Sequence, residues 1–235
     1  KAEDDWELEV EGVKVLVDSG AFTELNLHGR YRHSVDEYAA ELHRLYTAGV
    51  VNIEAAVAQD YMCEAFMLAK TGMTVEQHQQ LTIERYDALV EALERLFGGT
   101  VPFPVVPVLQ GYAAADYVRH VVAYGDRLKP GMWVGVGSVC KRNGAPQAIA
   151  AVLRAIKAVR PDLQLHGFGV KKTSLLNAVV RSLLATADSM AWSFAARKQG
   201  RDSNDWREAK AFVRVIMDTV HQAAAWRQLD MFEAA

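Results

Sequence analysis

The sequence contains little cysteine. Cys63 and Cys140 are the only two cysteines among 235 residues, and neither belongs to a Cys-x-x-Cys pair. A disulfide framework is therefore excluded, and we expect reduced thiols in a cytoplasmic protein. The seven histidines show no metal-ligand spacing with cysteines or carboxylates, so we expect neither a metal nor another cofactor.

Long apolar runs and phosphate-binding glycine motifs are also missing. No run approaches the roughly 20 apolar residues that a membrane-spanning helix needs, and Lys1–Trp6 lacks the apolar core of a signal peptide. We therefore expect no membrane contact. Neither Gly-x-Gly-x-x-Gly nor Gly-x-x-x-x-Gly-Lys-Ser/Thr occurs, which argues against dinucleotide binding and ATP hydrolysis.

Acidic residues are scarce in the central segment. Residues 119–172 contain 2 Asp+Glu against 10 Lys+Arg, whereas residues 1–118 contain 20 against 8, although the whole chain has a net charge of only −3. A segment this basic is typical of a surface that binds a polyanion such as nucleic acid. The alternative is that its charges, such as Arg154 and Lys157, only solvate a helix face.

The length and composition fit one globular domain. Hydrophobic residues make up 51% of the chain and charged residues 23%, the balance of a folded protein. Because single α/β barrel domains commonly reach about 200–250 residues, we expect one domain over residues 1–235.

Short apolar runs alternate along the chain with stretches of helical spacing. The predicted strands are 14–17, 50–57, 105–109, 133–136, 164–168 and, weakly, 187–192. The predicted helices are 35–47, 74–97, 113–124, 145–159, 174–185 and 203–228. Thr74 and Gln77 have the spacing of a capping box at the start of the second helix. Alternation of strand and helix predicts an α/β protein with a parallel sheet.

We expect a TIM-type (β/α)8 barrel. Only six strands are visible where such a barrel needs eight, so its N-terminal strands are weakly patterned or absent from these residues. In barrels and open doubly wound sheets alike, ligands bind at the carboxyl ends of the strands. Polar residues at those ends are therefore the candidates for function.

Two aspartates each follow a short apolar run. Asp18 comes after Val15–Val17, and Asp188 comes after Ala185–Ala187. Two carboxylates that converge on one cavity from different strands can divide a displacement at a sugar carbon, because one attacks while the other moves protons. The alternative for each aspartate is a turn or a helix N-cap.

Read in order, the strand ends resemble the tRNA-guanine transglycosylase superfamily, and more closely its DNA-acting branch, the DpdA family of 7-deazaguanine DNA-modification proteins. The segments that carry the resemblance are 18–22 (Asp-Ser-Gly-Ala-Phe, similar to the family's DSGGFQ), 59–64, 108–111, 135–139 and 165–169. Asp188 stands in the place of the nucleophilic aspartate, and Arg197 lies where the family has an arginine.

The sequence departs from the superfamily pattern. Ala21 replaces a glycine, Thr23 a glutamine and Leu109 a valine. The transfer-RNA enzymes carry a zinc site of three cysteines and a histidine after the nucleophile. No cysteine follows Cys140 here, so the zinc subdomain is missing, and this loss favours the DNA branch.

The resemblance implies that guanine in DNA is exchanged for a 7-deazaguanine, the 7-cyano form or a derivative, through a covalent aspartyl-sugar intermediate. Asp188 would attack C1′, and Asp18 would protonate the leaving purine. That second role requires a pKa above the usual aspartate value, which burial beside Phe22 would supply. The partners implied are DNA, the free 7-deazaguanine base and other DNA-modification proteins.

The resemblance also implies a base pocket. Asp60 would accept hydrogen bonds from N1–H and the 2-amino group, with a helix cap as the alternative. Gln110 and the Gly111 amide would read O6 and the 7-substituent, while Phe22 and Met190 would sandwich the base or belong to the core. The remaining expected pocket residues are Cys63, Gly137, Ser138 and Gly167.

The expected phosphate contacts come from basic residues after the later strands: Lys141, Arg142, Lys171, Lys172 and Arg197. Their alternative is solvated loop charge. His166 either touches the ligand or is a satisfied core histidine. Two other functions stay open: the same exchange on transfer RNA, and a non-catalytic barrel that binds nucleic acid or nucleobase.

Overall fold

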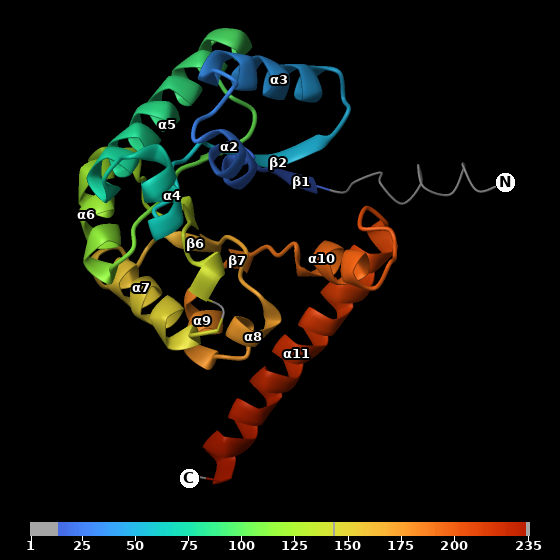
Figure 1. The fold of residues 1–235 in the computed structure, drawn as a ribbon. Coiled ribbons are helices and arrows are strands. Elements are labelled where there is room, and N and C mark those ends of the chain that lie inside the picture. Colours follow the sequence, from blue (N-terminus) through green and yellow to red (C-terminus); the bar gives the residue numbers. More distant parts are fainter. Residues whose placement is uncertain (1–13, 143, 234–235) are drawn as a thin grey trace, which may run out of the picture. The chain divides into compact units, whose positions relative to one another are not determined.

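The computed structural model describes residues 14–142 and 144–233, with side chains as far as residue 221 (Figure 1). The described chain divides into two compact units. Unit 1 holds residues 14–112 and 119–128, and unit 2 holds residues 113–118 and the remainder from 129 onward. The boundaries between them fall just before, within and a few residues after the helix Ala114–Tyr124.

Unit 1 contains a three-stranded parallel sheet in the order β1-β2-β3. The strands of this sheet are β1 (Lys14–Val17), β2 (Asn52–Val57) and β3 (Val105–Val106), and unit 1 also contains β4 (Val108–Leu109), which is not part of it. Its helices are α2 (Ala21–His28), α3 (Val35–Thr47), α4 (Ala65–Thr71), α5 (Val75–Phe97), the end of α6 (Ala114–Tyr124) and the short η1 (Gly125–Arg127). The predicted strand 105–109 is interrupted at Pro107, which has no N–H to donate to a ladder.

The long helix α5 begins as its sequence predicts. Thr74 accepts a hydrogen bond from the Gln77 backbone, and the Gln77 side chain accepts one from the Thr74 backbone. This capping box satisfies two backbone donors that the first helical turn would otherwise leave without partners. The apolar stripe of α5 is buried, with Leu89 and Leu93 fully so, which fixes this helix in the core of unit 1.

Unit 2 contains the parallel strands β5 (Trp133–Val136), β6 (Gln164–Gly167) and β7 (Thr186–Ala187). Its other elements are the short η2 (Cys140–Arg142) and the helices α7 (Pro146–Val159), α8 (Lys172–Leu175), α9 (Ala178–Leu183), α10 (Ala191–Lys198) and α11 (Trp206–Glu233). The apolar stripe of α7 is buried, including Ile149, Leu153 and Ile156. The sheet register pairs Gly135 with His166 and His166 with Thr186.

The structure confirms the α/β class with parallel strands, while the eight-stranded barrel and the single domain over 1–235 stay predictions. The weak strand predicted over 187–192 is wrong beyond Ala187, because α10 begins at Ala191. The predicted helix 174–185 is two helices, and Asn177 caps the second through its side chain.

Residues 1–13, which precede β1, lie outside the described residues. Within the described parts, no helix combines the length and apolar character that crossing a bilayer requires.

We expect Thr74→Ala to lower the free energy of unfolding by about 1 kcal/mol, because it removes the side-chain half of the capping box. Thr74→Ser keeps the hydroxyl and is the matched control, with a smaller loss. Urea denaturation of both variants measures the difference. Equal losses in the two would show that the hydroxyl does not cap α5.

Candidate functional site

Three of the predicted site residues lie at strand ends of unit 1. Asp18 directly follows β1, Asp60 lies in the segment after β2, and Gln110 directly follows β4. Strands β1 and β2 run parallel with Val17 opposite Ala56, so their carboxyl ends lie at the same edge of the sheet. This is the edge at which parallel sheets bind ligands.

Asp60 is a buried carboxyl group with a specific partner. Its exposed fraction is 6%, and Nε2 of Gln110 donates a hydrogen bond to its Oδ2. The pKa of Asp60 is raised from its ordinary 3.8 to about 7, mainly by burial and in addition by the charge of Asp18, while the Gln110 hydrogen bond opposes the rise. The effect of Asp18 indicates that the two carboxylates of β1 and β2 are electrostatically coupled.

The backbone of Asp60 is held by a tyrosine. The hydroxyl of Tyr31 donates to the Asp60 carbonyl at 2.9 Å and accepts from the Asp60 N–H at 3.0 Å. Burial raises the pKa of Tyr31 well above its ordinary value, and the Asp60 charge adds to the rise, so this hydroxyl keeps its proton. The Arg85 guanidinium lies 4.8 Å from the centre of the Tyr31 ring, a cation–π contact that holds the ring in place.

Gln110 is fixed from behind by a histidine and a second glutamine. The Gln110 N–H donates to Nδ1 of His120 at 2.9 Å, and Nε2 of Gln79 donates to the Gln110 carbonyl at 2.6 Å. Nε2 of His120 lies 3.1 Å from the Gln79 carbonyl. Because a carbonyl oxygen only accepts, Nε2 must be the donor in this hydrogen bond. Burial lowers the pKa of His120 to about 4, so the ring is neutral at pH 7 with its proton on Nε2.

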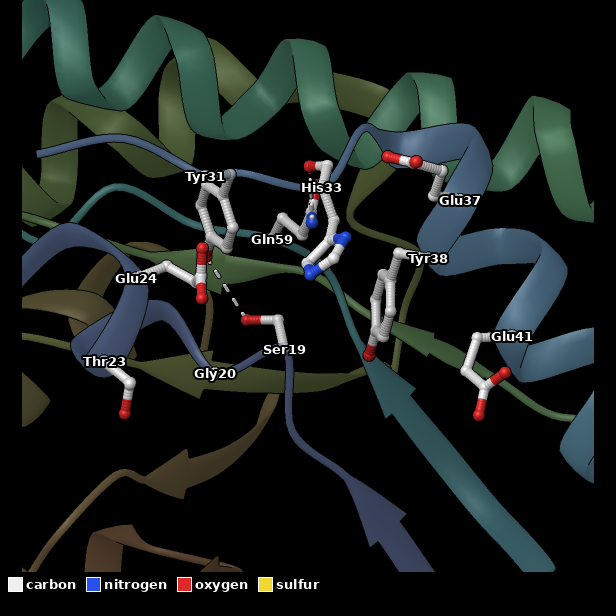
Figure 2. Close-up of a pocket in the computed structure, with 10 residues that line it drawn as sticks. All are labelled: Ser19, Gly20, Thr23, Glu24, Tyr31, His33, Glu37, Tyr38, Glu41 and Gln59. Atoms are coloured by element: carbon white, nitrogen blue, oxygen red, sulfur yellow. Dashed lines mark hydrogen bonds between the residues drawn. The ribbon is translucent and has the colours of Figure 1, made fainter. Parts of the chain in front are cut away.

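A cavity of about 540 Å³ adjoins this group (Figure 2). Its lining includes Ser19 and Gln59, the sequence neighbours of Asp18 and Asp60, and the Tyr31 hydroxyl, which lies 3.4 Å from Oγ of Ser19. The other lining residues are Gly20, Thr23, Glu24, His33, Glu37, Tyr38 and Glu41. The cavity is large enough for a small planar ligand.

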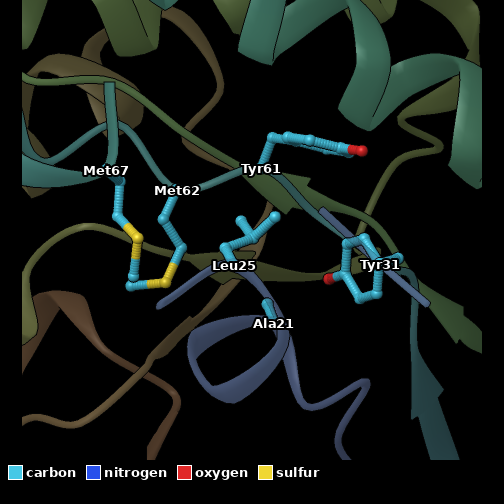
Figure 3. Close-up of a cluster of buried hydrophobic side chains, with 6 residues drawn as sticks. All are labelled: Ala21, Leu25, Tyr31, Tyr61, Met62 and Met67. Carbon is cyan, nitrogen blue, oxygen red and sulfur yellow. The ribbon is translucent and has the colours of Figure 1, made fainter. Parts of the chain in front are cut away.

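A cluster of apolar side chains joins helix α2 to the segment that carries Asp60. Figure 3 shows Leu25 of α2 lying among Met62, Tyr61 and Tyr31, all of them buried. Because Tyr61 and Met62 directly follow Asp60, this packing fixes the position of the carboxylate. The remaining members of the cluster are Ala21 and Met67.

One expected burial in unit 1 is wrong. Phe22 is 44% exposed and Asp18 is itself exposed, so Asp18 is not buried beside Phe22. The carboxyl group that burial affects is Asp60. Cys63 is buried with its Sγ 3.7 Å from the Tyr61 carbonyl, and Gly111 is buried next to Gln110. Tyr31, Gln79 and His120 were missed, because none of them stands at a strand end.

In unit 2, the predicted nucleophile Asp188 directly follows β7. Its Oδ1 accepts a hydrogen bond from the Gly169 N–H at 2.9 Å, and its own N–H lies 3.4 Å from the Gly167 carbonyl. Nε2 of His166 lies 3.4 Å from the same Oδ1. The Asp188 side chain is 48% exposed, so one face of the carboxylate is open to a ligand.

The loop after β5 is held rigidly. The Tyr117 hydroxyl donates to the Gly137 carbonyl at 2.7 Å, and Ser138 is buried in left-handed backbone at φ 54°. Gly135 in β5 leaves room for the Phe168 ring, since a Cβ there would lie 2.3 Å from that ring. Gly167 is buried and Met190 is 63% exposed, which leaves Met190 available as one face of a base sandwich.

The predicted phosphate contacts lie on the surface of unit 2. Lys141, Lys171, Lys172 and Arg197 are exposed and Arg142 is half-buried. Lys141 and Arg142 belong to η2 after β5, and Lys171 with Lys172 begins α8 after β6. Their role in binding phosphate stays a prediction, as does the convergence of Asp18 and Asp188. Among the described residues, no group of three His, Cys, Asp or Glu side chains is arranged to hold a metal ion.

We expect Asp60→Asn to gain stability relative to the wild type as the pH rises from about 5 to about 8. The wild-type contribution from protonated Asp60 is fully present below its unfolded pKa of 3.8 and is lost as the pH rises through about 7. Asparagine does not titrate, and His120 is common to both proteins, so its effect cancels. Thermal unfolding across this range measures the difference, and a constant difference would contradict the raised pKa.

The comparisons with known proteins agree with the strand-end resemblance. No curated protein matches the chain. The model of one protein family does match, over residues 6–227, and that family is DpdA, described as DeoxyPurine in DNA protein A. Since the match covers nearly the whole sequence, the chain belongs to the DpdA family.

Proposed function

We propose that this chain is a DNA-guanine transglycosylase, which replaces guanine in DNA by a 7-deazaguanine through a covalent aspartyl-sugar intermediate. Membership of the DpdA family supports a role in deazapurine modification of DNA. The observation that carries the enzymatic assignment is the buried pair of Asp60 and Gln110 at the strand ends, beside the charge of Asp18.

The Asp60 carboxylate suits the edge of a guanine-like base. Such a base presents two adjacent donors, N1–H and the 2-amino group, and an ionised carboxylate accepts from both. Asp60 is buried and held in place by Tyr31 and Gln110, so hydrogen bonds to a base are made without displacing bulk water from the carboxylate. A purine that lacks these donors would leave the buried carboxylate with the Gln110 donor alone, which gives selectivity.

The chemistry at the sugar requires two displacements. One Asp188 oxygen forms a bond to C1′ as the bond from C1′ to N9 of guanine breaks, and Asp18 supplies the proton that the departing base needs. The nitrogen of the incoming base then attacks C1′, gives its proton to Asp18, and the electron pair of the ester bond returns to Asp188. Two inversions at one carbon retain its configuration.

Base affinity should rise with pH, because the ionised form of Asp60 binds the base and its pKa lies at about 7. We expect 7-cyano-7-deazaguanine to bind wild-type protein more tightly at about pH 8 than at about pH 6, by at most about tenfold per pH unit. Calorimetric titration measures the affinity. Asp60→Asn should flatten the dependence, and Glu91→Gln, an exposed carboxylate of the same unit, should not. A flat wild-type profile would remove Asp60 from base recognition.

Cells that express the chain should contain a 7-deazaguanine nucleoside in their DNA. Mass spectrometry of nucleosides from DNA and from transfer RNA tests this, with Asp188→Asn expected to abolish the product. Asp162→Asn is the matched control, since it removes a half-buried carboxylate of the same unit that pairs with Arg160. A deazaguanine found only in transfer RNA would support the transfer-RNA reading, and none in either would favour a non-catalytic binding protein.

A further inference from the structure

His166 is a buried histidine with one nitrogen that the fold does not satisfy. The residue is 3% exposed, and its Nε2 has no hydrogen-bond partner among the described residues. Oδ1 of Asp188 lies 3.4 Å from this nitrogen, and the pair does not meet the geometry of a hydrogen bond. A buried polar group without a partner costs about 1–3 kcal/mol, so its retention here calls for a functional explanation.

The other ring nitrogen is fixed by a chain of hydrogen bonds across the sheet. Nε1 of Trp133, which can only donate, donates to Oγ1 of Thr186 at 2.8 Å. The same Oγ1 lies 2.8 Å from Nδ1 of His166. Thr186 and His166 are opposite each other in the register of β6 and β7, so the sheet itself sets this contact.

The Asp188 carboxylate selects the tautomer of His166, because the Thr186 hydroxyl can either donate to Nδ1 or accept from it. If the Thr186 hydroxyl donates to Nδ1, the ring proton stands on Nε2 and faces the Asp188 carboxylate. The opposite tautomer would aim a lone pair of Nε2 at a carboxylate oxygen, which is repulsive. The rings of Trp133 and Phe168 pack edge-to-face against the imidazole at 5.7 and 4.7 Å and prevent it from turning.

We propose that His166 is a positioning residue for the nucleophile, and that its Nε2–H and the Gly169 N–H together hold Oδ1 of Asp188. The inference rests on the proposed function. The Gly169 bond is already formed at 2.9 Å, whereas the His166 contact at 3.4 Å closes when the carboxylate moves onto the sugar. Among the described residues none donates a hydrogen bond to Oδ2, so Oδ2 is the oxygen that bonds to C1′.

The two donors act mainly on the second displacement. Once Oδ2 is bonded to C1′, Oδ1 is the carbonyl oxygen of the aspartyl ester. As the incoming base displaces the ester, negative charge returns to the carboxylate, and donors placed at Oδ1 stabilise it as it develops. Loss of the His166 donor should therefore slow release of the covalent intermediate more than its formation.

The test uses the purified chain, a guanine-containing oligodeoxynucleotide and radiolabelled guanine as the free base. In His166→Leu, which removes the donor, we expect exchange to fall at least about tenfold, and the fraction of DNA in a denaturant-stable adduct to rise. The KM for DNA should fall together with kcat, because the covalent intermediate accumulates, and kcat/KM for DNA should change little. His166→Gln keeps an N–H near the position of Nε2 and should recover part of the rate.

Thr186→Val provides a second variant that leaves the imidazole in place. It removes the hydroxyl that donates to Nδ1 when the proton stands on Nε2, so exchange should fall in the same direction but by less. Thermal unfolding shows which variants are folded, and only folded variants are used to test the inference. If His166→Leu folds, a wild-type exchange rate and adduct level in it would overturn the inference. If it does not fold, the same result in both His166→Gln and Thr186→Val would overturn it.

A measurement on the protein alone separates this inference from the proposed function. Nitrogen NMR of histidine-labelled chain should show His166 as the Nε2–H tautomer, with a resonance that shifts in Asp188→Asn. The Nδ1–H tautomer would overturn the inference even in an active enzyme. Absence of exchange in the wild type, with the expected tautomer present, would instead contradict the proposed transglycosylase reaction and leave His166 with a purely structural contact.

Discussion

The burial of one carboxyl group, Asp60, is the constraint on which the candidate site depends. A carboxylate taken out of water must be neutralised, hydrogen-bonded or matched by a ligand. Here Gln110 supplies one donor to the side chain and Tyr31 fixes the backbone, while the nearby charge of Asp18 opposes ionisation. The site therefore holds a group that is poised to ionise when a suitable donor pair arrives, and a guanine-like base offers that pair.

The surroundings of Asp60 explain much of the architecture of unit 1. Helix α2 packs Leu25 against the residues that follow Asp60, and α5 brings Gln79 to the Gln110 carbonyl. Neutral His120 completes the arrangement, because only an uncharged imidazole accepts from Gln110 and donates to Gln79 at once. These contacts keep the polar atoms of the site in place before any ligand binds, which lowers the reorganisation that binding requires.

Most of this site could be predicted from the sequence, for a physical reason. Parallel strands place their carboxyl ends together, so Asp18, Asp60 and Gln110 could be recognised from apolar runs followed by polar residues. The capping box of α5 could be predicted in the same way, since it depends on local spacing. The supporting residues could not. Tyr31 and His120 lie outside strand ends, and their roles come from tertiary contacts that no periodicity records. Short helices such as α2 and α10 were missed because one or two turns carry too little pattern.

In unit 2 the close approach of Phe168 to Gly135 affects how mutations at position 135 would be interpreted. The aromatic ring occupies the space that a methyl group at position 135 would need, and the same ring lies against His166. An alanine encoded there would push the ring toward the imidazole or out of the sheet. A mutation at this codon would therefore resemble a catalytic lesion in a genetic screen, although the altered residue itself carries no reactive atom.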